Sequence, residues 1–352
     1  MNVGLIYTSA TAAMLKEAPE LAFNLSDAPE TIEAVQTALE AGGHTVILLN
    51  TDPQFPARLV DTPMDIAFNI ATGFYGETRA AHVAAMLDYL NIPHTGSGVR
   101  AETLLTYKPI MKALMVEHGV PTPPFQWFQQ ADQPLDPRLR YPLIVKLPAE
   151  GGSLGMTPRS VVYNEADLRE QVALMLRKYQ QGALVEEFID GREFTVSVLG
   201  NTPPYVLPIV ERQYFGDIHI QLDEPEHTTL EFYRGLGHTA SEPLEYTPVD
   251  SQSVAPADIT AAQRAQIERI CVAAYQLFTC ADWARLDLRM DDAGNCFIFD
   301  VNLEPAIAPD YAVARAAYAA GWTYTQLVNT ILQHAVERYP QLRKANTHGA
   351  DR

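Results

Sequence analysis

The sequence is poor in cysteine and in basic residues, and it contains no long apolar run. Its cysteines, Cys271, Cys280 and Cys296, have no CxxC spacing, which argues against a disulfide framework and a cysteine zinc site. No apolar stretch reaches about 18 residues, so no membrane span is predicted. With 43 acidic and 25 basic residues, the formal charge of −18 disfavours a nucleic-acid partner. A globular cytoplasmic protein is expected, which binds anions through local cations, amide groups or metal ions.

Common signatures of nucleotide binding and of export are missing as well. Neither the Walker A spacing nor the dinucleotide fingerprint occurs in the sequence. The start, MNVGLIYTSA, has no basic region before its short apolar run and predicts a first β-strand rather than a signal peptide. A chain of 352 residues is expected to form two or three domains.

The order of apolar patterns predicts an α/β protein. Apolar strands at 2–8 and 44–50 flank a helix that ends at Gly42, which indicates a small parallel α/β unit. The polar, acidic segment 212–258 is predicted to be a flexible or lid-like loop, and the tail after Lys344 to be disordered. Further helices are predicted near 104–118, 260–278, 312–320 and 323–338.

Residues 286–302, LDLRMDDAGNCFIFDVN, predict a β-hairpin, because two alternating apolar arms flank a polar cluster. A uniform register that pairs Asp291 with Cys296 places Asp287 opposite Asp300. The side chains predicted on the opposite, core-facing side are Leu286, Leu288, Phe299 and Val301.

The same register puts Arg285 opposite Asn302, on the face of the two aspartates. Like charges on neighbouring strands repel, so this face requires a cation. The carboxylates of Asp287 and Asp300 with the amide oxygen of Asn302 are hard donors that suit Mg²⁺. Alternatively, Arg285 and Arg289 neutralise the aspartates as a surface salt-bridge ladder, and the hairpin alone favours neither interpretation.

Two other stretches have the composition of ligand sites. In KLPAEGGSLG, residues 146–155, small residues after a strand-ending lysine let backbone N–H groups surround an oxyanion. The acidic run 186–189, with Glu193, closes an apolar strand and offers acceptors to an adenine or a ribose. A plain turn and strand-end solvation are the respective alternatives. Together with the hairpin, these stretches supply the parts needed to hold Mg-ATP.

Seven motifs occur in a familiar order and spacing, from about Phe68 to Asn302: FNIATGFYGE, IPHTGSG, TYKPIMK, GVPTPPF, PLIVKLPAEGGSLGM, ALVEEFIDGREFTV and ARLDLRMDDAGNCFIFDVN. On these motifs the chain resembles the ATP-grasp superfamily, most closely its D-alanine–D-alanine ligase branch. The resemblance implies an α/β (α+β) ATP-grasp fold with an N-terminal preATP-grasp, Rossmann-like domain. The implied divisions are an N-terminal domain (1–104), a central ATP-grasp subdomain (105–190), a C-terminal catalytic domain (191–340) and a tail (341–352).

The resemblance also implies roles for individual residues. Lys108 and Lys146 would contact the phosphates of ATP. Arg285 and Ser153 would be catalytic, with Arg285 stabilising the oxyanion that forms when an amine attacks an acyl phosphate. Two Mg²⁺ ions, or Mn²⁺ as a substitute, would be held by Asp287, Asp300 and Asn302. The remaining ATP-binding residues would be Glu150, Gly151, Gly152, Ser153 and Gly155 over the phosphates, Glu186, Glu187, Phe188 and Ile189 at the adenine, and Glu193 at the ribose.

The expected amino-acid pocket departs from the family. The first strand runs into Tyr7-Thr8-Ser9-Ala10 without the family's substrate-binding glutamate, and the substrate histidine of the family is Thr72 here. No lysine lies near 214–217, where the family has a loop lysine; Arg212 or Arg234 is the candidate replacement. The family's Thr-Ser-Pro-Gly-Met-Thr is LEPAIA at 303–308. Candidate substrate residues are Thr72, Arg212, Glu304, Asp310 and Arg315.

These departures predict an ATP-dependent, ADP-forming carboxylate–amine ligase with a rebuilt pocket, which joins small amino-acid-type substrates through an acyl phosphate. The alternatives are a true D-alanine–D-alanine ligase of cell-wall synthesis, a mycosporine-type amino-acid ligase and an ATP-binding protein without turnover. Small molecules, rather than nucleic acid or membrane, are the expected partners. A homodimer is one oligomeric state that the family resemblance suggests.

Overall fold

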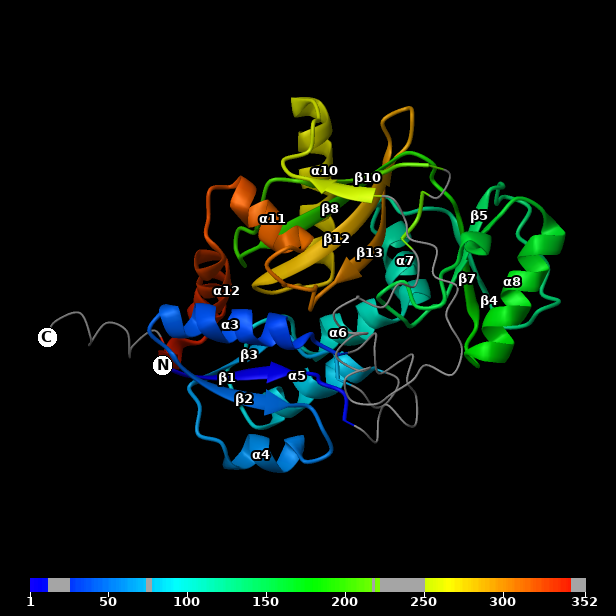
Figure 1. Cartoon of the computed structure of the whole chain (residues 1–352). Coiled ribbons are helices and arrows are strands. Elements are labelled where there is room, and N and C mark those ends of the chain that lie inside the picture. Colours follow the sequence, from blue (N-terminus) through cyan, green and yellow to red (C-terminus); the bar gives the residue numbers. More distant parts are fainter. Residues whose placement is uncertain (12–25, 74–77, 217–218, 222–250, 343–352) are drawn as a thin grey trace, which may run out of the picture.

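The computed structural model contains three β-sheets, which lie in three separate parts of the molecule (Figure 1). It describes residues 1–11, 26–73, 78–216, 219–221 and 251–342. Within these residues no helix is both long enough and apolar enough to cross a bilayer.

The N-terminal sheet is parallel, with the strand order β2-β1-β3. Strands β1 and β3 are buried, with apolar residues such as Leu5 and Phe68 covered by helices, whereas β2 at the edge of the sheet is partly exposed. The strands are β1 (Asn2–Tyr7), β2 (Thr45–Asn50) and β3 (Ile66–Asn69), and the helices are α3 (Pro29–Ala41), α4 (Phe55–Asp61) and α5 (Arg79–Tyr89). The predicted parallel unit is confirmed, although α4 was not predicted.

The second sheet is antiparallel, with the order β4-β7-β5-β6, and α8 packs on it (Figure 1). Two of its strands end in residues that the sequence suggested for ATP: one ends at Lys146 and another at Glu186 and Glu187. Its elements are β4 (Phe125–Phe128), β5 (Leu143–Lys146), β6 (Val161–Val162), β7 (Ala183–Glu187) and α8 (Glu165–Lys178).

The third sheet is antiparallel and has the order β11-β10-β8-β12-β13, with β9 paired to β8. Its strands are β8 (Arg192–Leu199), β9 (Tyr205–Val206), β10 (Val210–Tyr214), β11 (Ser251–Val254), β12 (Trp283–Met290) and β13 (Cys296–Asn302). The later helices are α10 (Ala261–Leu277), α11 (Ala312–Ala319) and α12 (Tyr324–Arg338). Helix α10 begins at a capping box formed by Thr260 and Gln263, and Cys271 within it is buried.

The single helix predicted over 104–118 is wrong, because two helices occupy this part of the chain. Helix α6 (Val99–Thr106) ends before Tyr107, whose φ of −104° and ψ of 92° are not helical, and α7 (Lys108–Glu117) begins after it. Pro109 explains the break, since in a continuous helix it could not donate to the carbonyl oxygen of Leu105 and its ring would clash with that carbonyl group. Lys108 therefore lies in the first turn of α7.

The β12–β13 hairpin confirms the facing aspartates but corrects the predicted register. Asp287 lies opposite Asp300, while Met290, rather than Asp291, lies opposite Cys296. A bulge adjoining Asp287 and Leu288 accounts for the difference.

The bulge also changes the face occupied by Phe299. In the core, Ile298 is fully buried, whereas Phe299 lines a cleft on the opposite side. There its ring centroid lies 5.1 Å from the ammonium nitrogen of Lys146. The predicted core positions of Leu286, Leu288 and Val301 are confirmed, and that of Phe299 is wrong.

The segment 212–258 is not irregular throughout, because β10 and β11 lie at its two ends and pair antiparallel. Its interior, 222–250, and the tail after Lys344 lie outside the described residues. The domain boundaries stay a prediction. Met111 and Met115 of α7 pack in the same core as β8, β12 and β13, so α7 contributes to the support of the third sheet.

Candidate active site

A cleft of about 810 Å³ lies where the three sheet units meet. Its walls include Thr72 beyond β3, Lys146 of β5 and Asp287 of β12. The residues that the sequence suggested for ATP, metal, catalysis or substrate line this cleft, except Gly155, and except Arg234, which lies outside the described residues. The described structure therefore brings together candidates that are far apart in the chain.

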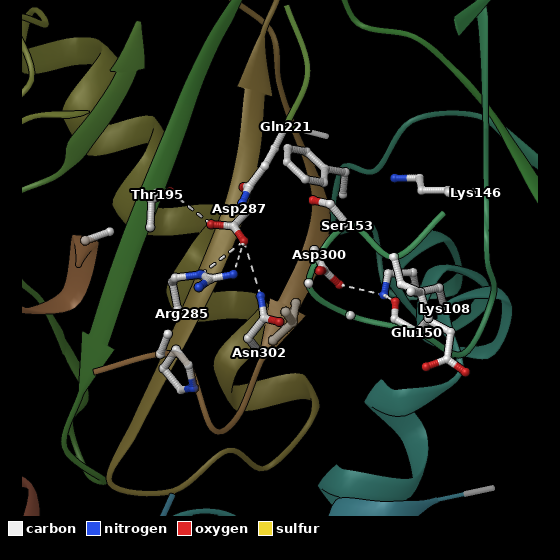
Figure 2. Close-up of a pocket in the computed structure, with 18 of the residues that line it drawn as sticks. Lys108, Lys146, Glu150, Ser153, Thr195, Gln221, Arg285, Asp287, Asp300 and Asn302 are labelled. Atoms are coloured by element: carbon white, nitrogen blue, oxygen red, sulfur yellow. Dashed lines mark hydrogen bonds and ion pairs between the residues drawn. The ribbon is translucent and has the colours of Figure 1, made fainter. Parts of the chain in front are cut away.

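Asp287 is held in a network of donors on the floor of the cleft (Figure 2). Its Oδ2 accepts hydrogen bonds from Nε and Nη2 of Arg285, at 3.1 and 2.9 Å, and from Nδ2 of Asn302 at 3.2 Å. Its Oδ1 accepts one from Oγ1 of Thr195 at 3.0 Å. Burial raises the pKa of Asp287, and the positive charge of Arg285 partly offsets that rise.

Asp300 projects from β13 into the same space as Asp287 (Figure 2). Its Oδ1 lies 3.3 Å from Nζ of Lys108. Burial opposes ionisation of Asp300, but the ammonium groups of Lys108 and Lys146 outweigh it and lower the pKa of the carboxyl group. The two aspartates are thus held in different protonation environments although they face each other.

Of the two arginines that could neutralise the aspartates, only Arg285 does so. Arg285 pairs with Asp287, whereas Arg289 pairs with Glu193 at 2.6 Å. The donor set also fits a divalent cation. Because Asn302 donates through its nitrogen to Asp287, its amide oxygen remains available beside the two carboxylates.

The loop that follows Lys146 has a backbone suited to wrapping an anion. Gly152 and Ser153 are consecutive residues with φ near +61° and +60°, in the left-handed region, and such turns direct backbone N–H groups to a common point. Gly155, at φ +76°, does not line the cleft; a Cβ there would lie 3.0 Å from the hydroxyl oxygen of Tyr179. The close approach of Tyr179 and the positive φ both explain why this position is a glycine.

Glu150 fixes the start of this loop from several directions. Its carboxylate accepts hydrogen bonds from Nη2 of Arg79 and from Nε2 of Gln181, both at 2.7 Å. Its backbone oxygen accepts one from Nζ of Lys108 at 2.8 Å. Because these donors come from different parts of the fold, Glu150 ties the loop to the rest of the cleft.

Glu186 is buried between two lysines. Its Oε2 lies 2.6 Å from Nζ of Lys146, and its Oε1 lies 3.0 Å from Nζ of Lys112. Burial lowers the pKa of Lys112 to about 8, although the charge of Glu186 opposes the shift. Nζ of Lys112 also donates to Oγ1 of Thr122 at 2.5 Å, so its ammonium group is held by two partners.

Replacing Glu186 with glutamine is expected to lower the free energy of unfolding by about 3 to 5 kcal/mol at pH 7, because both lysines lose their shared buried carboxylate. Urea unfolding measures this change. Glu187→Gln is the matched control, since the neighbouring carboxylate accepts a hydrogen bond only from the backbone N–H of Arg140 among the described contacts. An equal loss of stability in both variants would contradict the assignment.

The predicted base and ribose positions contain an arginine that the sequence analysis did not place there. Nε and Nη2 of Arg289 donate to Oε2 of Glu193 at 3.0 and 2.6 Å, and Nη1 donates to the backbone oxygen of Ile189 at 3.1 Å. The guanidinium lies 4.7 Å from the ring centroid of Phe188. Tyr214 donates to the other oxygen of Glu193 at 3.0 Å. This end of the cleft is therefore preorganised by paired charges.

The candidate substrate residues line the cleft in two places, because Arg212 lies beside Glu193 on the neighbouring strand β8 and the other four come from elsewhere in the chain. Thr72, Glu304, Asp310 and Arg315 all line it, and Arg315 donates through Nε to the backbone oxygen of Asp310 at 2.6 Å. Arg212 lines the cleft from β10 and donates to Gln221 and Ser251, each at 3.2 Å. Burial raises the pKa of Glu304 to about 7. Glu102 of α6 contacts Glu304 here, a neighbour that the sequence did not reveal.

The comparisons with known proteins decide the family. A family profile described as D-ala D-ala ligase C-terminus matches residues 114–333. The chain belongs to the D-alanine–D-alanine ligase family. It is an ATP-grasp ligase, as the motif resemblance predicted.

Individual relatives support the assignment to the D-alanine–D-alanine ligase family. A D-alanine–D-alanine ligase of Pelotomaculum thermopropionicum is 30% identical over 318 residues, covering 88% of this chain and 92% of the relative. An uncharacterized protein of Sinorhizobium fredii, y4sG, is 35% identical over 315 residues, covering 87% and 88%. The structure of a Bacillus anthracis D-alanine–D-alanine ligase complexed with ATP covers 96% of this chain and 98% of its own, with a TM-score of 0.71 and 20% identity. The predicted fold class is confirmed.

Several residues that line or support the cleft of this D-alanine–D-alanine ligase family member were not assigned to it from the sequence. Lys112 had a signal, since it is the second lysine of TYKPIMK, but a helix pattern does not show which lysine faces inward. The others lie in unremarkable strand or helix patterns and become partners only through the fold. The residues missed are Arg79, Glu102, Lys112, Thr195, Arg289 and Phe299.

Proposed function

We propose that this protein is an ATP-dependent, ADP-forming carboxylate–amine ligase that activates a small carboxylate as an acyl phosphate and joins it to an amine. The observation that supports this function best is the sharing of one cleft by the phosphate-type loop, Lys108, Lys146 and the Arg285–Asp287–Asp300 cluster. Phosphorylation gives a carboxylate a leaving group, and attack by an amine then creates an oxyanion. Arg285, fixed by Asp287, supplies a stationary positive charge for that oxygen.

The cleft residues divide the work of the proposed reaction. Lys108 and Lys146 neutralise phosphate charge, and the backbone of Gly152 and Ser153 wraps the transferred phosphoryl group. Glu186 positions Lys146 through its buried ion pair. Asp287, Asp300 and Asn302 would hold Mg²⁺, which when bound neutralises charge on the phosphate oxygens. The cluster formed by Arg289, Glu193 and Phe188 would receive the base and ribose of ATP.

The substrate pair proposed here differs from two D-alanines, because the family's Thr-Ser-Pro-Gly-Met-Thr is replaced by residues 303–308 at the substrate end. A true D-alanine–D-alanine ligase is the second candidate, favoured by the relative of that name at 30% identity. Homodimer formation stays a prediction from the family resemblance.

An ADP-release assay with Mg-ATP over D- and L-amino acids, dipeptides and mycosporine-type acceptors tests the proposal. We expect turnover with a pair other than D-alanine with D-alanine, and mass spectrometry of the product should show loss of one water between the two substrates. Strong turnover with D-alanine alone would support the second candidate instead. Tight ATP binding without ADP release from any pair would support a non-catalytic role.

A further inference from the structure

The substrate end of the cleft contains a pair of carboxyl groups without a cation. Glu102 and Glu304 both line the cleft and lie within hydrogen-bonding contact of each other. Glu102 is only 3% exposed, and no described residue donates a hydrogen bond to its Oε1. A buried carboxyl oxygen without a donor is costly, so this atom requires an explanation.

Five other carboxyl groups that line the cleft differ from this pair. Among the described residues, each of the following carboxylates has an arginine or lysine within ion-pairing distance: Glu150, Glu186, Glu193, Asp287 and Asp300. The described ion pairs include none with Glu102 or Glu304. The fold has thus supplied internal cations to one set of carboxylates and left this pair open towards the substrate space.

We infer that Glu102 and Glu304 together bind a protonated amine of the substrate, an inference that rests on the proposed ligase function. Two carboxylates surrounding one ammonium satisfy several of its N–H donors and remove their mutual repulsion. Apolar side chains of Leu105, Leu303 and Ile307 also line this part of the cleft, so an ammonium on a short apolar stem suits it.

The chemistry of the site also separates this amine from the nucleophile. An amine attacks an acyl phosphate only as the free base, with its electron pair available. An ammonium held between two carboxylates keeps its proton and does not attack. The substrate is therefore an amine-bearing molecule, such as an amino acid whose own ammonium does not react, and Glu102 and Glu304 act as specificity-determining residues.

Thermal unfolding of the full chain with added ligands tests this inference without requiring turnover. The probes are matched pairs that differ in one amine: alanine against lactate, and lysine against norleucine. A ligand that binds the folded state raises the melting temperature. We expect at least one amine-bearing member to raise it more than its partner, and we expect Glu102→Gln to abolish that difference.

Glu117→Gln provides the matched control, because Glu117 is an exposed glutamate on α7 and the change removes the same charge. It should retain the wild-type response. Without ligand, Glu102→Gln should melt no lower than the wild-type protein, since the glutamine amide can still donate a hydrogen bond to Glu304 in place of the protonated carboxyl group. A large drop in the ligand-free melting temperature would show that the pair serves the fold, and would overturn the inference.

Two further results would also contradict the proposed amine site. One is an equal response to both members of each probe pair; the other is a Glu102-dependent stabilisation by Mg²⁺ alone. The ADP-release assay separates this outcome from failure of the proposed function. If turnover occurs, Glu102→Gln should raise KM for the amine-bearing substrate at least about tenfold, with KM for ATP unchanged, which corresponds to the loss of one charged contact.

Discussion

The Asp300→Asn variant is expected to lose roughly 100-fold or more of kcat for ADP release, because the amide removes a charge from the centre of the proposed metal cluster. Its thermal stability should change little, since two effects oppose each other. The substitution relieves repulsion with the facing Asp287, but it also deprives Lys108 of an ion pair at 3.3 Å. Loss of activity with a retained fold is the distinguishing combination.

Asp292→Asn is the control for this experiment, because Asp292 lies exposed at the tip of the same hairpin and makes the same charge change outside the cleft. Electron paramagnetic resonance of added Mn²⁺ gives a readout that does not depend on turnover. We expect Asp300→Asn to weaken Mn²⁺ binding and Asp292→Asn to leave it unchanged. If Asp300→Asn kept near-normal kcat and Mn²⁺ affinity, the metal assignment would be refuted.

The hairpin shows how far strand periodicity predicts a site. Alternation along the arms placed Asp287 opposite Asp300, and the structure confirms this. The bulge turns Phe299 towards the cleft. It could not be predicted, because phenylalanine is compatible with either face of the hairpin. Apolar patterning gives the register where the two faces differ in polarity, and fails where the inserted residue is apolar.

The break between α6 and α7 is a different kind of error, since its signal was present. Pro109 removes a backbone donor, and in a continuous helix its ring would clash with the carbonyl group of Leu105. The apolar periodicity over 104–118 outweighed this signal in the prediction. The consequence reaches the site, because the break places Lys108 in the first helical turn, where it donates to the backbone oxygen of Glu150.

The pairing of charges in the cleft was beyond the reach of the sequence. Arg289 and Glu193 are 96 residues apart, yet Nε and Nη2 of Arg289 both donate to Oε2 of Glu193, because β12 and β8 are adjacent strands. The motif resemblance suggested what Glu193 binds in the family, but not which side chain of this protein holds it. Partners of this kind follow from strand order, which local patterns do not determine.

Replacement of Arg285 is expected to have the largest effect on the chemical step. Arg285→Met should lower kcat by roughly 100- to 1000-fold, because the proposed oxyanion loses its fixed positive charge. Its KM for ATP should change much less, since the predicted base and phosphate contacts come from other residues. The variant should also lose roughly 2 to 3 kcal/mol of stability, because Asp287 keeps a buried carboxylate without its arginine.

Arg285→Lys distinguishes charge from structural support. A lysine keeps the positive charge but cannot reproduce the two hydrogen bonds that Nε and Nη2 donate to Asp287. If the charge acts on the oxyanion, Arg285→Lys should retain at least about tenfold more activity than Arg285→Met. Arg264→Met, which disrupts an exposed ion pair with Glu268 on α10, should leave kcat unchanged. Equal activity of the lysine and methionine variants would mean that Arg285 supports Asp287 without acting on the substrate.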